Sequence, residues 1–373
     1  MRDTPLTRLH AKAGAKLVEF AGWRLPVAFS SIGDEVTACR RTAALFDISH
    51  MGTIRIFGRG AASAASALLT RNVSAIPASC ASYALLCNDE GGILDDLLVY
   101  VESSEAIRLV VNAVNHGKDV AWITPRLDAD GDAAIEDLQG LTFAIAVQGP
   151  RAPELLKAAR FEGRMPVFFG AFFHGKVVGE DVLVSRTGYT GEDGFEIFGA
   201  AQAAEAVYRA LTEAARDYSA IWAGLGARDV LRQEMGYPLW GQDIDESTTP
   251  LEARLGWVLD WDHDFVGGAA VREAEPTRRR FGFRLQDSGV ARAGAPVFTG
   301  ETQVGVVTSG TYSHNLGAAI GQGYAEAAAN LRAGDEIEIE VRGRPVGALV
   351  HKLPFFEKRT RPSWKAFEER REA

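Results

Sequence analysis

Residues 88–101 join a tight turn to an apolar strand that carries two adjacent carboxylates. The turn, residues 88–92, contains the Asn and Gly residues that accept positive φ, and residues 93–101 are rich in the branched and aromatic side chains of strands. Since successive strand side chains point to opposite faces, Asp95 and Asp96 point in opposite directions. Their neighbours are mostly apolar on both faces. We therefore expect at least one carboxylate to lie against a hydrophobic wall or in a cleft.

The two acids have a functional and a structural interpretation. An unpaired charge in an apolar setting is costly, so the pKa of such a carboxyl rises, which is how a working acid is made. In the structural interpretation, one Asp caps a loop and the other pairs with a lysine. This strand alone does not decide between them.

Length and composition limit the class of protein. A chain of 373 residues is too long for one core and predicts two or three domains. A hydrophobic content of 47%, a charged content of 24% and a net charge of −9 indicate a soluble globular protein that does not bind nucleic acid. Three cysteines without a C-x-x-C pair suit the cytoplasm, and each is expected to be a buried thiol. No apolar run is long enough to span a membrane.

The pattern of elements predicts an α+β fold followed by an all-β region. Residues 53–140 show strands and helices in an order typical of antiparallel hairpins, and this unit is predicted to be inserted into a first one. Residues 44–51 are interpreted as a mixed connector. After residue 277 we expect strands with only a short helix near residues 325–331, forming a small barrel or jelly roll. The expected domains are 1–52 with 141–245, 53–140 with the connecting segment 246–277, and 278–373.

Several common motifs are missing or incomplete. The sequence GLG at residue 224 lacks the third glycine of a dinucleotide-binding turn, and no phosphate-binding loop or nucleophile elbow is present. The seven histidines lack metal-ligand spacing, so no metal is expected. His50 is the histidine of most interest, and a hydrogen-bonded structural role is the simpler interpretation.

Three charged side chains lie within apolar segments. Glu196 is flanked by Phe and Ile on a predicted strand, so it must be paired or receive donors from a ligand. Arg228 and Arg232 lie four residues apart, on one face of a predicted helix. They form either an internal pair with a glutamate or a site for a polar, planar ligand, because guanidinium and carboxylate both favour bidentate hydrogen bonds.

Taken together, these segments resemble the aminomethyltransferase, or T-protein, family of the glycine cleavage system. The similarity covers nearly the whole chain and is carried, in order, by TPL, FAGW, FDISHM, NDEGGILDDLLVY, AVQGP, TGYTGEDGFEI, GLGARD, GQDIDE and TSGTYS. It implies a three-domain cloverleaf of two α+β domains, ferredoxin-like or Greek-key, plus a C-terminal β-barrel or jelly roll, around a central folate cavity. The chain departs from the family's pattern at residues 313–317 and in a basic tail at residues 361–371.

The resemblance also implies a reaction and its residues. The methylene of an aminomethyl group on the lipoyl arm of the H-protein passes to tetrahydrofolate, and ammonia leaves. Asp96 matches the essential acid, Glu196 the pterin-binding glutamate and Arg228 a folate-contacting arginine. The same likeness places further residues along the cavity: Met51, Tyr83, Tyr100, Asn112, Tyr189 and Trp257.

Two other functions remain open from the sequence. A tetrahydrofolate-dependent demethylase of a small molecule could use the same fold. A non-catalytic folate-binding factor for iron-sulfur assembly would need a functional cysteine in a basic motif, and none of the three cysteines has such a setting.

Overall fold

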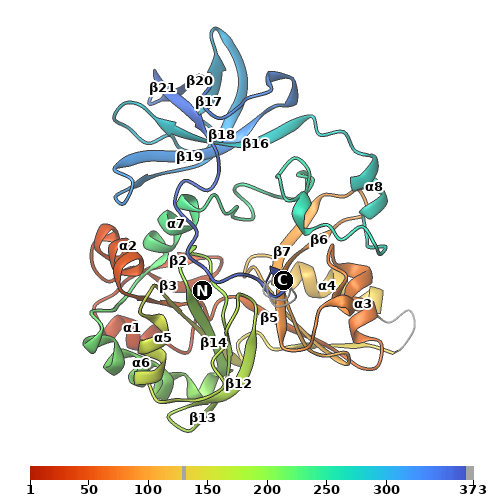
Figure 1. The fold of residues 1–373 in the computed structure, drawn as a ribbon, viewed down its shortest axis with the longest axis vertical. Helices are drawn as coiled ribbons and strands as arrows, with labels where there is room; N and C mark the ends of the chain where they lie inside the picture. The colour runs from red at the N-terminus through yellow and green to blue at the C-terminus, as the bar shows by residue number, and fades with distance from the viewer. Residues whose placement is uncertain (128–131, 367–373) are drawn as a thin grey trace.

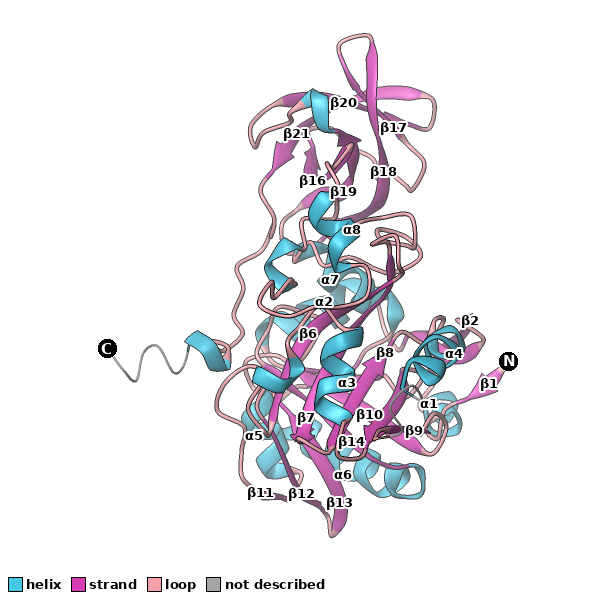
Figure 2. Ribbon diagram, turned by 90° about the vertical axis from the view of Figure 1, so that its right-hand side faces the viewer, coloured by secondary structure: helices cyan, strands magenta, loops and turns pink. Residues whose placement is uncertain are grey.

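The computed structural model describes residues 1–127 and 132–366. Three lobes surround a central region, with the C-terminal strands forming the upper lobe in Figure 1 and the two mixed lobes lying below it. The side view in Figure 2 shows the C-terminal lobe stacked at one end of an elongated molecule. The last residues of the expected basic tail, 367–371, lie outside the described residues. No helix within the described ranges is both long and apolar enough to cross a membrane.

A seven-stranded sheet forms the centre of the first lobe. Its strands, in spatial order, are β11 (Phe161–Gly163), β12 (Phe172–Val177), β13 (Glu180–Ser185), β14 (Gly194–Ala200), β10 (Thr142–Gln148), β4 (Ala44–Asp47) and β15 (Ile221–Trp222). The helices of this lobe are α1 (Thr7–Lys12), α2 (Ile32–Arg41), α5 (Ala152–Ala158), α6 (Ala204–Asp217) and α7 (Leu225–Glu234). A small sheet of β1 (Arg2–Asp3), β3 (Trp23–Ala28) and β2 (Lys16–Phe20) lies beside it.

The alternation of side chains along β10 gives this sheet two buried faces. Phe143, Ile145 and Val147 pack in one hydrophobic cluster with residues of α5 and α6. Ala144 and Ala146 point the other way, into a second cluster that includes residues of α2 and α7 and of the neighbouring lobe. Period-two alternation thus places α5 and α6 on one face of the sheet, and α2, α7 and the neighbouring lobe on the other.

A five-stranded antiparallel sheet forms the second lobe. Its order is β6 (Cys80–Cys87), β7 (Ile93–Ser103), β8 (Ala106–Val111), β5 (Gly52–Phe57) and β9 (Ala134–Asp137), and the helices are α3 (Ala61–Leu68) and α4 (His116–Leu127) with the short turn η1 (Val73–Ala75). The predicted strand at residues 93–101 is therefore β7. It is the second strand of its sheet, paired on both sides.

The third lobe is a closed six-stranded barrel, which confirms the predicted α+β fold with a C-terminal β-barrel. The barrel order is β16 (Arg278–Leu285), β19 (Ala318–Glu326), β18 (Thr302–Ser313), β17 (Pro296–Thr299), β20 (Glu336–Val341) and β21 (Arg344–His351). Before it, η3 (Gly256–Val258) and α8 (Gly268–Glu273) lie along the second lobe. The expected short helix near residues 325–331 is only a 3-10 turn, η4 (Ala327–Ala329). We propose that the three lobes correspond to the domain boundaries expected from the sequence.

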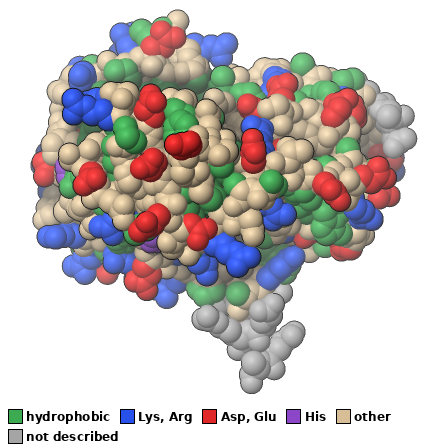
Figure 3. Space-filling view, turned by 90° about the horizontal axis from the view of Figure 1, so that it is seen from above, with side chains coloured by type: hydrophobic (Ala, Val, Ile, Leu, Met, Phe, Trp, Pro, Cys, Tyr) green, Lys and Arg blue, Asp and Glu red, His purple; other side chains and the backbone are tan. Residues whose placement is uncertain are grey.

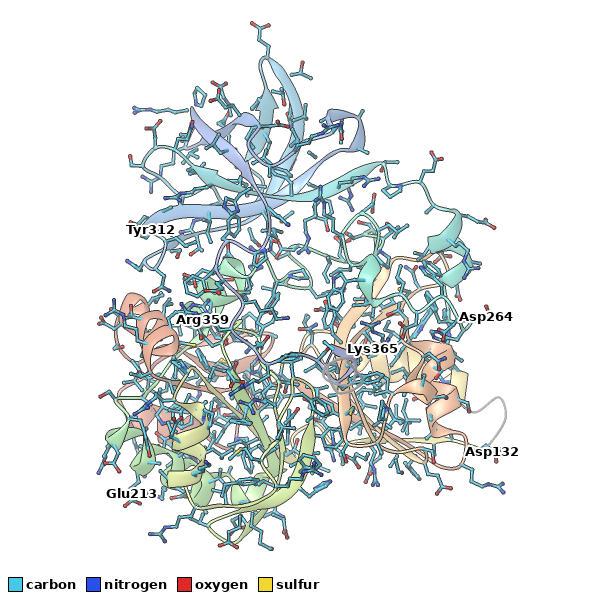
Figure 4. All side chains as sticks on the ribbon, viewed as in Figure 1. Asp132, Glu213, Asp264, Tyr312, Arg359 and Lys365 are labelled. Carbon is cyan, nitrogen blue, oxygen red and sulfur yellow. The ribbon has the colours of Figure 1, made fainter. Side chains whose placement is uncertain are left out.

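The chain returns from the barrel to the other two lobes. The amides of Phe355 and Phe356 donate to the carbonyl of Glu234 at the end of α7, at 2.9 and 3.0 Å. Arg359 follows, with its amide donating to the carbonyl of Gly191 at 2.8 Å, and Figure 4 shows it between the barrel and the first lobe. This segment ties the barrel to the loop that leads into β14.

Residues 44–51, interpreted as a connector, contain a strand. β4 pairs antiparallel with β10 and parallel with β15, and all four of its residues are buried. A short strand covered on both faces has no alternation of apolar and polar residues, so periodicity does not reveal it. The expectation of a connector was wrong for this reason.

The turn before β7 packs directly against the loop of residues 241–250. A Cβ on Gly92 would lie 1.8 Å from the carbonyl oxygen of Glu246, a backbone atom that cannot rotate away. The amide of Ile93 donates to the carbonyl of Thr248 at 3.0 Å. Only glycine fits here, and the turn sets the position of the strand that carries the two acids.

We expect Gly92→Ala to destabilise the protein by ~1–3 kcal/mol or more, because the loop must shift to admit the methyl group. Chemical unfolding measures this change. Gly117→Ala, on α4, is the matched control, since a Cβ there meets no atom within 4 Å. Equal stability of the two variants would contradict the close packing of the turn.

Candidate active site

The predicted central cavity is present, with a volume of about 1460 Å³, larger than the ~300–1,000 Å³ of most ligand pockets. Its wall draws on all three lobes, for example Glu196 on β14, Asp96 on β7 and Arg280 on β16. Seen from above, Figure 3 shows acidic and basic side chains interspersed on the outer surface. The cavity, in contrast, is where the charged groups singled out from the sequence come together.

Asp96 faces the cavity and is half-buried. Its Oδ2 accepts a hydrogen bond from the hydroxyl of Tyr83 at 2.9 Å, and its Oδ1 accepts one from Nδ2 of Asn112 at 2.8 Å. Tyr83 pairs with Leu98 on β7, so its side chain lies diagonal to Asp96 on the same face of the sheet. Tyr83 and Asn112, both expected to line the cavity, thus orient the carboxyl of Asp96.

Burial is the main cause that raises the pKa of Asp96 to about 7, and the negative charge of Asp95 adds to it. The hydrogen bonds from Tyr83 and Asn112 act in the opposite direction. A carboxyl that titrates near neutral pH can both donate and accept a proton under physiological conditions.

Asp95 points away from the cavity and is fully buried. Its Oδ2 accepts from the Asn112 amide at 3.0 Å, and its Oδ1 accepts from Nδ2 of Asn112 at 2.8 Å and from Nδ2 of Asn115 at 2.6 Å. Within the described part of the chain, neither acid is paired with a lysine as the structural interpretation required. The alternation of the strand therefore gives the two acids different surroundings.

Glu196 lies on β14, opposite Ser185 of β13, and only 6% of it is exposed. Its Oε2 accepts a hydrogen bond from the hydroxyl of Thr187 at 2.5 Å. Burial raises the pKa of Glu196, while the Thr187 hydrogen bond and the charge of Arg228 lower it. This carboxylate lines the cavity without a lysine or arginine within ion-pair distance among the described residues.

The two arginines on α7 have different environments. Arg232 is buried and committed to the protein, with Nη1 bound to Oδ2 of Asp243 at 2.5 Å and Nη2 bound to the hydroxyl of Ser309 at 3.0 Å. Arg228 lines the cavity, and its guanidinium lies over the ring of Tyr189 at 4.8 Å. Within residues 1–127 and 132–366, no side-chain hydrogen bond or ion pair of Arg228 is found. Burial lowers its pKa, whereas the charge of Glu196 raises it.

Aromatic side chains form part of the cavity wall. The ring of Trp257 stacks on Tyr83, with centroids 5.7 Å apart, and Trp257 is 63% exposed, which places it at the opening. Tyr189 stacks on Tyr237 at 5.6 Å and donates its hydroxyl hydrogen to the carbonyl of Pro238. Met51 also lines the cavity. Flat rings and a thioether suit a planar, partly apolar ligand.

Tyr100 differs from the expectation, because it does not line the cavity. It lies on the same face of β7 as Asp96, but further along the strand, where Phe172 and Phe198 cover it at ring distances of 5.3 and 5.9 Å. Its hydroxyl is 3.3 Å from Oγ1 of Thr187, the residue that binds Glu196. Tyr100 therefore supports the site from behind the wall.

His50 also differs from the simpler interpretation. It is buried and lines the cavity, but its Nδ1 has no hydrogen-bond partner in the described part of the chain. Burial, together with the charge of Arg228, lowers the pKa of His50 to about 4. His50 is thus a neutral group facing the chamber rather than a hydrogen-bonded structural histidine.

Sequence reasoning missed Asn115 and Asp119, which surround Asp95. A signal was available, because residues 112, 115 and 119 are spaced three and four apart, the spacing of one helical face. Cys39, Cys80 and Cys87 are buried as expected, and burial raises the pKa values of Cys39 and Cys87 to about 12. These two thiols are therefore poor nucleophiles at neutral pH.

Comparison with known proteins identifies the class of fold and site. Residues 6–263 match the GCVT N-terminal domain, and residues 278–357 match the glycine cleavage T-protein C-terminal barrel domain. The crystal structure of the glycine cleavage system aminomethyltransferase T from Bartonella henselae superimposes with a TM-score of 0.90, at 35% identity, over 96% of this chain and 99% of that one. The chain belongs to the glycine cleavage T-protein family.

Curated relatives specify the activity. The aminomethyltransferase of Pseudothermotoga lettingae is 40% identical over 95% of this chain and 98% of its own length. The aminomethyltransferase of Thermotoga petrophila is 42% identical, also over 95% of this chain and 98% of its own length. The prediction of an aminomethyltransferase of the glycine cleavage system is confirmed by these matches.

Proposed function

We propose that the central cavity binds tetrahydrofolate and that Asp96 is the residue at which the methylene group is transferred. One observation carries the proposal: a carboxyl with a pKa near 7 faces the same chamber as a buried glutamate and a guanidinium that makes no ion pair with the described residues. When bound, the folate supplies the nitrogens that accept the methylene. The residues of this chain bind it, orient it and handle protons.

The pterin end would lie against Glu196 and Arg228. A pterin presents two adjacent N–H donors, which a carboxylate can accept together, and Glu196 is held for this by Thr187. Arg228 has donors that the rest of the described chain leaves unused, so an acceptor on the ligand would satisfy them. Tyr189, stacked beneath the guanidinium, supports its orientation.

Asp96 would act on the aminomethyl group. Loss of ammonia or thiolate from this group develops positive charge at carbon, and the carboxylate form of Asp96 stabilises that charge. The same carboxyl can move protons at the folate nitrogens. Tyr83 and Asn112 hold it in one orientation, so little reorganisation is needed when the charge develops.

The donor of the group would be the lipoyl arm of the H-protein. A long, flexible arm needs an opening, and Trp257 lies at one, beside Arg71 at 5.8 Å from the ring. Enclosure of the chamber by three lobes protects the reactive methylene from water. A cytoplasmic location remains a prediction from the cysteine content.

The pH dependence of kcat/KM should follow Asp96. Because the proposed role needs the ionised form, we expect activity to rise as the pH increases through about 7, the pKa that burial gives this group. A profile of the rate between acidic and alkaline pH measures the midpoint. A limb that falls through this region would show that the protonated form is the active one.

The assay that tests the function uses the full chain, aminomethylated lipoyl H-protein and tetrahydrofolate. We expect methylene transfer with release of one ammonia for each methylene. Demethylation of a small methylated amine, with no transfer from the H-protein, would instead show the demethylase activity that the sequence left open.

A further inference from the structure

A third carboxyl group lies behind the two acids of β7. Asp119, in the first turn of α4, is 0% exposed, and neither of its oxygens receives a hydrogen bond from an N–H or hydroxyl group of the described chain. An ionised carboxylate without donors in such a place would be strongly unfavourable. The Asp119 amide donates to the carbonyl of Asn115 at 2.8 Å, so the backbone is held in place by the helix.

The Asp119 carboxyl lies beside that of Asp95, close enough for each to act on the pKa of the other, and its two oxygens have no other partner among the described residues. Two carboxyl groups can share a hydrogen bond only when one of them carries a proton. Asp95 already accepts three hydrogen bonds from Asn112 and Asn115, which stabilise its ionised form. The proton therefore belongs to Asp119 and the charge to Asp95. Burial, followed by the charge of Asp95, raises the pKa of Asp119 to about 10.

Asn112 connects Asp95 to the acid that faces the cavity. Nδ2 of Asn112 lies 2.8 Å from both Oδ1 of Asp95 and Oδ1 of Asp96, so one amide joins the fully buried acid to the one that faces the cavity. The other ionisable groups around this cluster are Tyr83 on β6, Tyr189 beside the cavity and Lys118 on α4. Lys118 is engaged elsewhere, with Nζ bound to the carbonyl of Leu94 at 2.9 Å and to Glu246 at 2.8 Å.

We propose that Asp119 is a positioning residue, a neutral hydrogen-bond donor that keeps Asp95 ionised and thereby keeps a negative charge behind Asp96. It touches neither the cavity nor the substrate and acts only through Asp95. This role rests on the proposed function of Asp96. The protonation states of the three acids, however, can be measured without any assay of turnover.

The test measures the titration of Asp96 in the full-length protein by ¹³C NMR of labelled Asp carboxyl groups, assigned with an Asp96→Asn variant. Asp119→Asn retains a neutral donor, so the midpoint of Asp96 should stay within ~0.3 pH units of wild type. Asp119→Leu removes the donor, so Asp95 holds its charge less well and the midpoint should fall by ~1 unit or more, since the charge of Asp95 is one of the causes that raise the pKa of Asp96. The pH profile of methylene transfer should shift in the same way.

Two results would overturn the proposal. If Asp119 is ionised in the wild type, Asp119→Asn removes a charge and lowers the midpoint of Asp96 as the Leu variant does. If Asp119 is only structural, neither variant moves the midpoint. Should Asp119→Leu fail to fold, Asp95→Asn replaces it, because removal of that charge must also lower the midpoint, and an unchanged value would contradict the coupling.

The stability of the protein provides a second readout. With Asp119 protonated in the folded state and ionised in the unfolded state, the folded state binds more protons between the ordinary pKa and about 10. The free energy of unfolding contributed by this group therefore falls as the pH rises, and Asp119→Asn should remove that slope. An unchanged slope would contradict the protonated state.

If the NMR and stability results hold while methylene transfer is absent, the proposed function fails and the assignment of Asp119 stands.

Discussion

Asp96→Asn is expected to lower kcat for methylene transfer by ~10²–10⁴-fold, the usual contribution of a positioned acid or base, and to leave the folate dissociation constant nearly unchanged. The amide is close in size to the carboxyl and can still bond to Tyr83, so the cavity keeps its shape. What it loses is the negative charge beside the reacting carbon and the group that titrates. Single-turnover kinetics and folate titration separate the two effects.

The control for this variant is Asp89→Asn, in the turn before the same strand. Its carboxyl is 67% exposed, and its one ion pair with the described residues is a long contact of 3.5 Å with Arg126. We expect full activity. Unchanged turnover in Asp96→Asn, or an equal loss in Asp95→Asn, would mean that the other carboxylate, or none, carries the reaction.

The second large effect is expected for Glu196→Ala, which should raise the folate dissociation constant by ~10- to 10²-fold, because a hydrogen bond to a charged group contributes roughly 1.5–3 kcal/mol. At saturating folate, kcat should change much less than in Asp96→Asn. Equilibrium binding of a reduced folate measures the loss. A mutation that weakens binding while sparing chemistry separates the ligand-binding end of the cavity from the reacting end.

Glu213→Ala is the matched control, since Glu213 projects from α6 at the outer surface of the same lobe (Figure 4). It should bind folate as wild type does. Arg228→Leu should weaken binding alongside Glu196→Ala, since both contact the same end of the ligand in our proposal. An unaltered dissociation constant in Glu196→Ala would remove this residue from the binding site.

Strands whose apolar and polar residues alternate, or whose ends are marked by turn-forming residues, could be predicted from the sequence. Strands buried on both faces could not. β7 was found because the Asn and Gly residues of residues 88–92 mark its start. β4 has four buried residues and no alternation, so it resembled a connector. β3 was also missed. It contains Pro26, which weakens a strand prediction. In the structure Pro26 lies past the two residues of β3 that pair with β1, and it lies opposite Leu17, where the register with β2 shifts, a place where proline is tolerated.

The site was predicted mainly through residues whose chemistry conflicts with their surroundings. Asp96 and Glu196 are acids in apolar strands, and that conflict is visible in the sequence. The different roles of Arg228 and Arg232 were not visible, because both lie on one face of α7. Only the fold shows that Asp243 and Ser309 engage Arg232 and leave Arg228 to the cavity. Whether an arginine faces a ligand depends on which residues from distant segments bind it. The spacing of residues along the chain does not identify those partners.

The most direct test of the account is a crystal structure of the protein with a reduced folate bound. We predict that the pterin lies in the central cavity with its N–H donors on Glu196 and that the carboxyl of Asp96 lies beside the nitrogens that accept the methylene. A folate bound outside this cavity, or one inside it whose reactive nitrogens lie far from Asp96, would contradict the account.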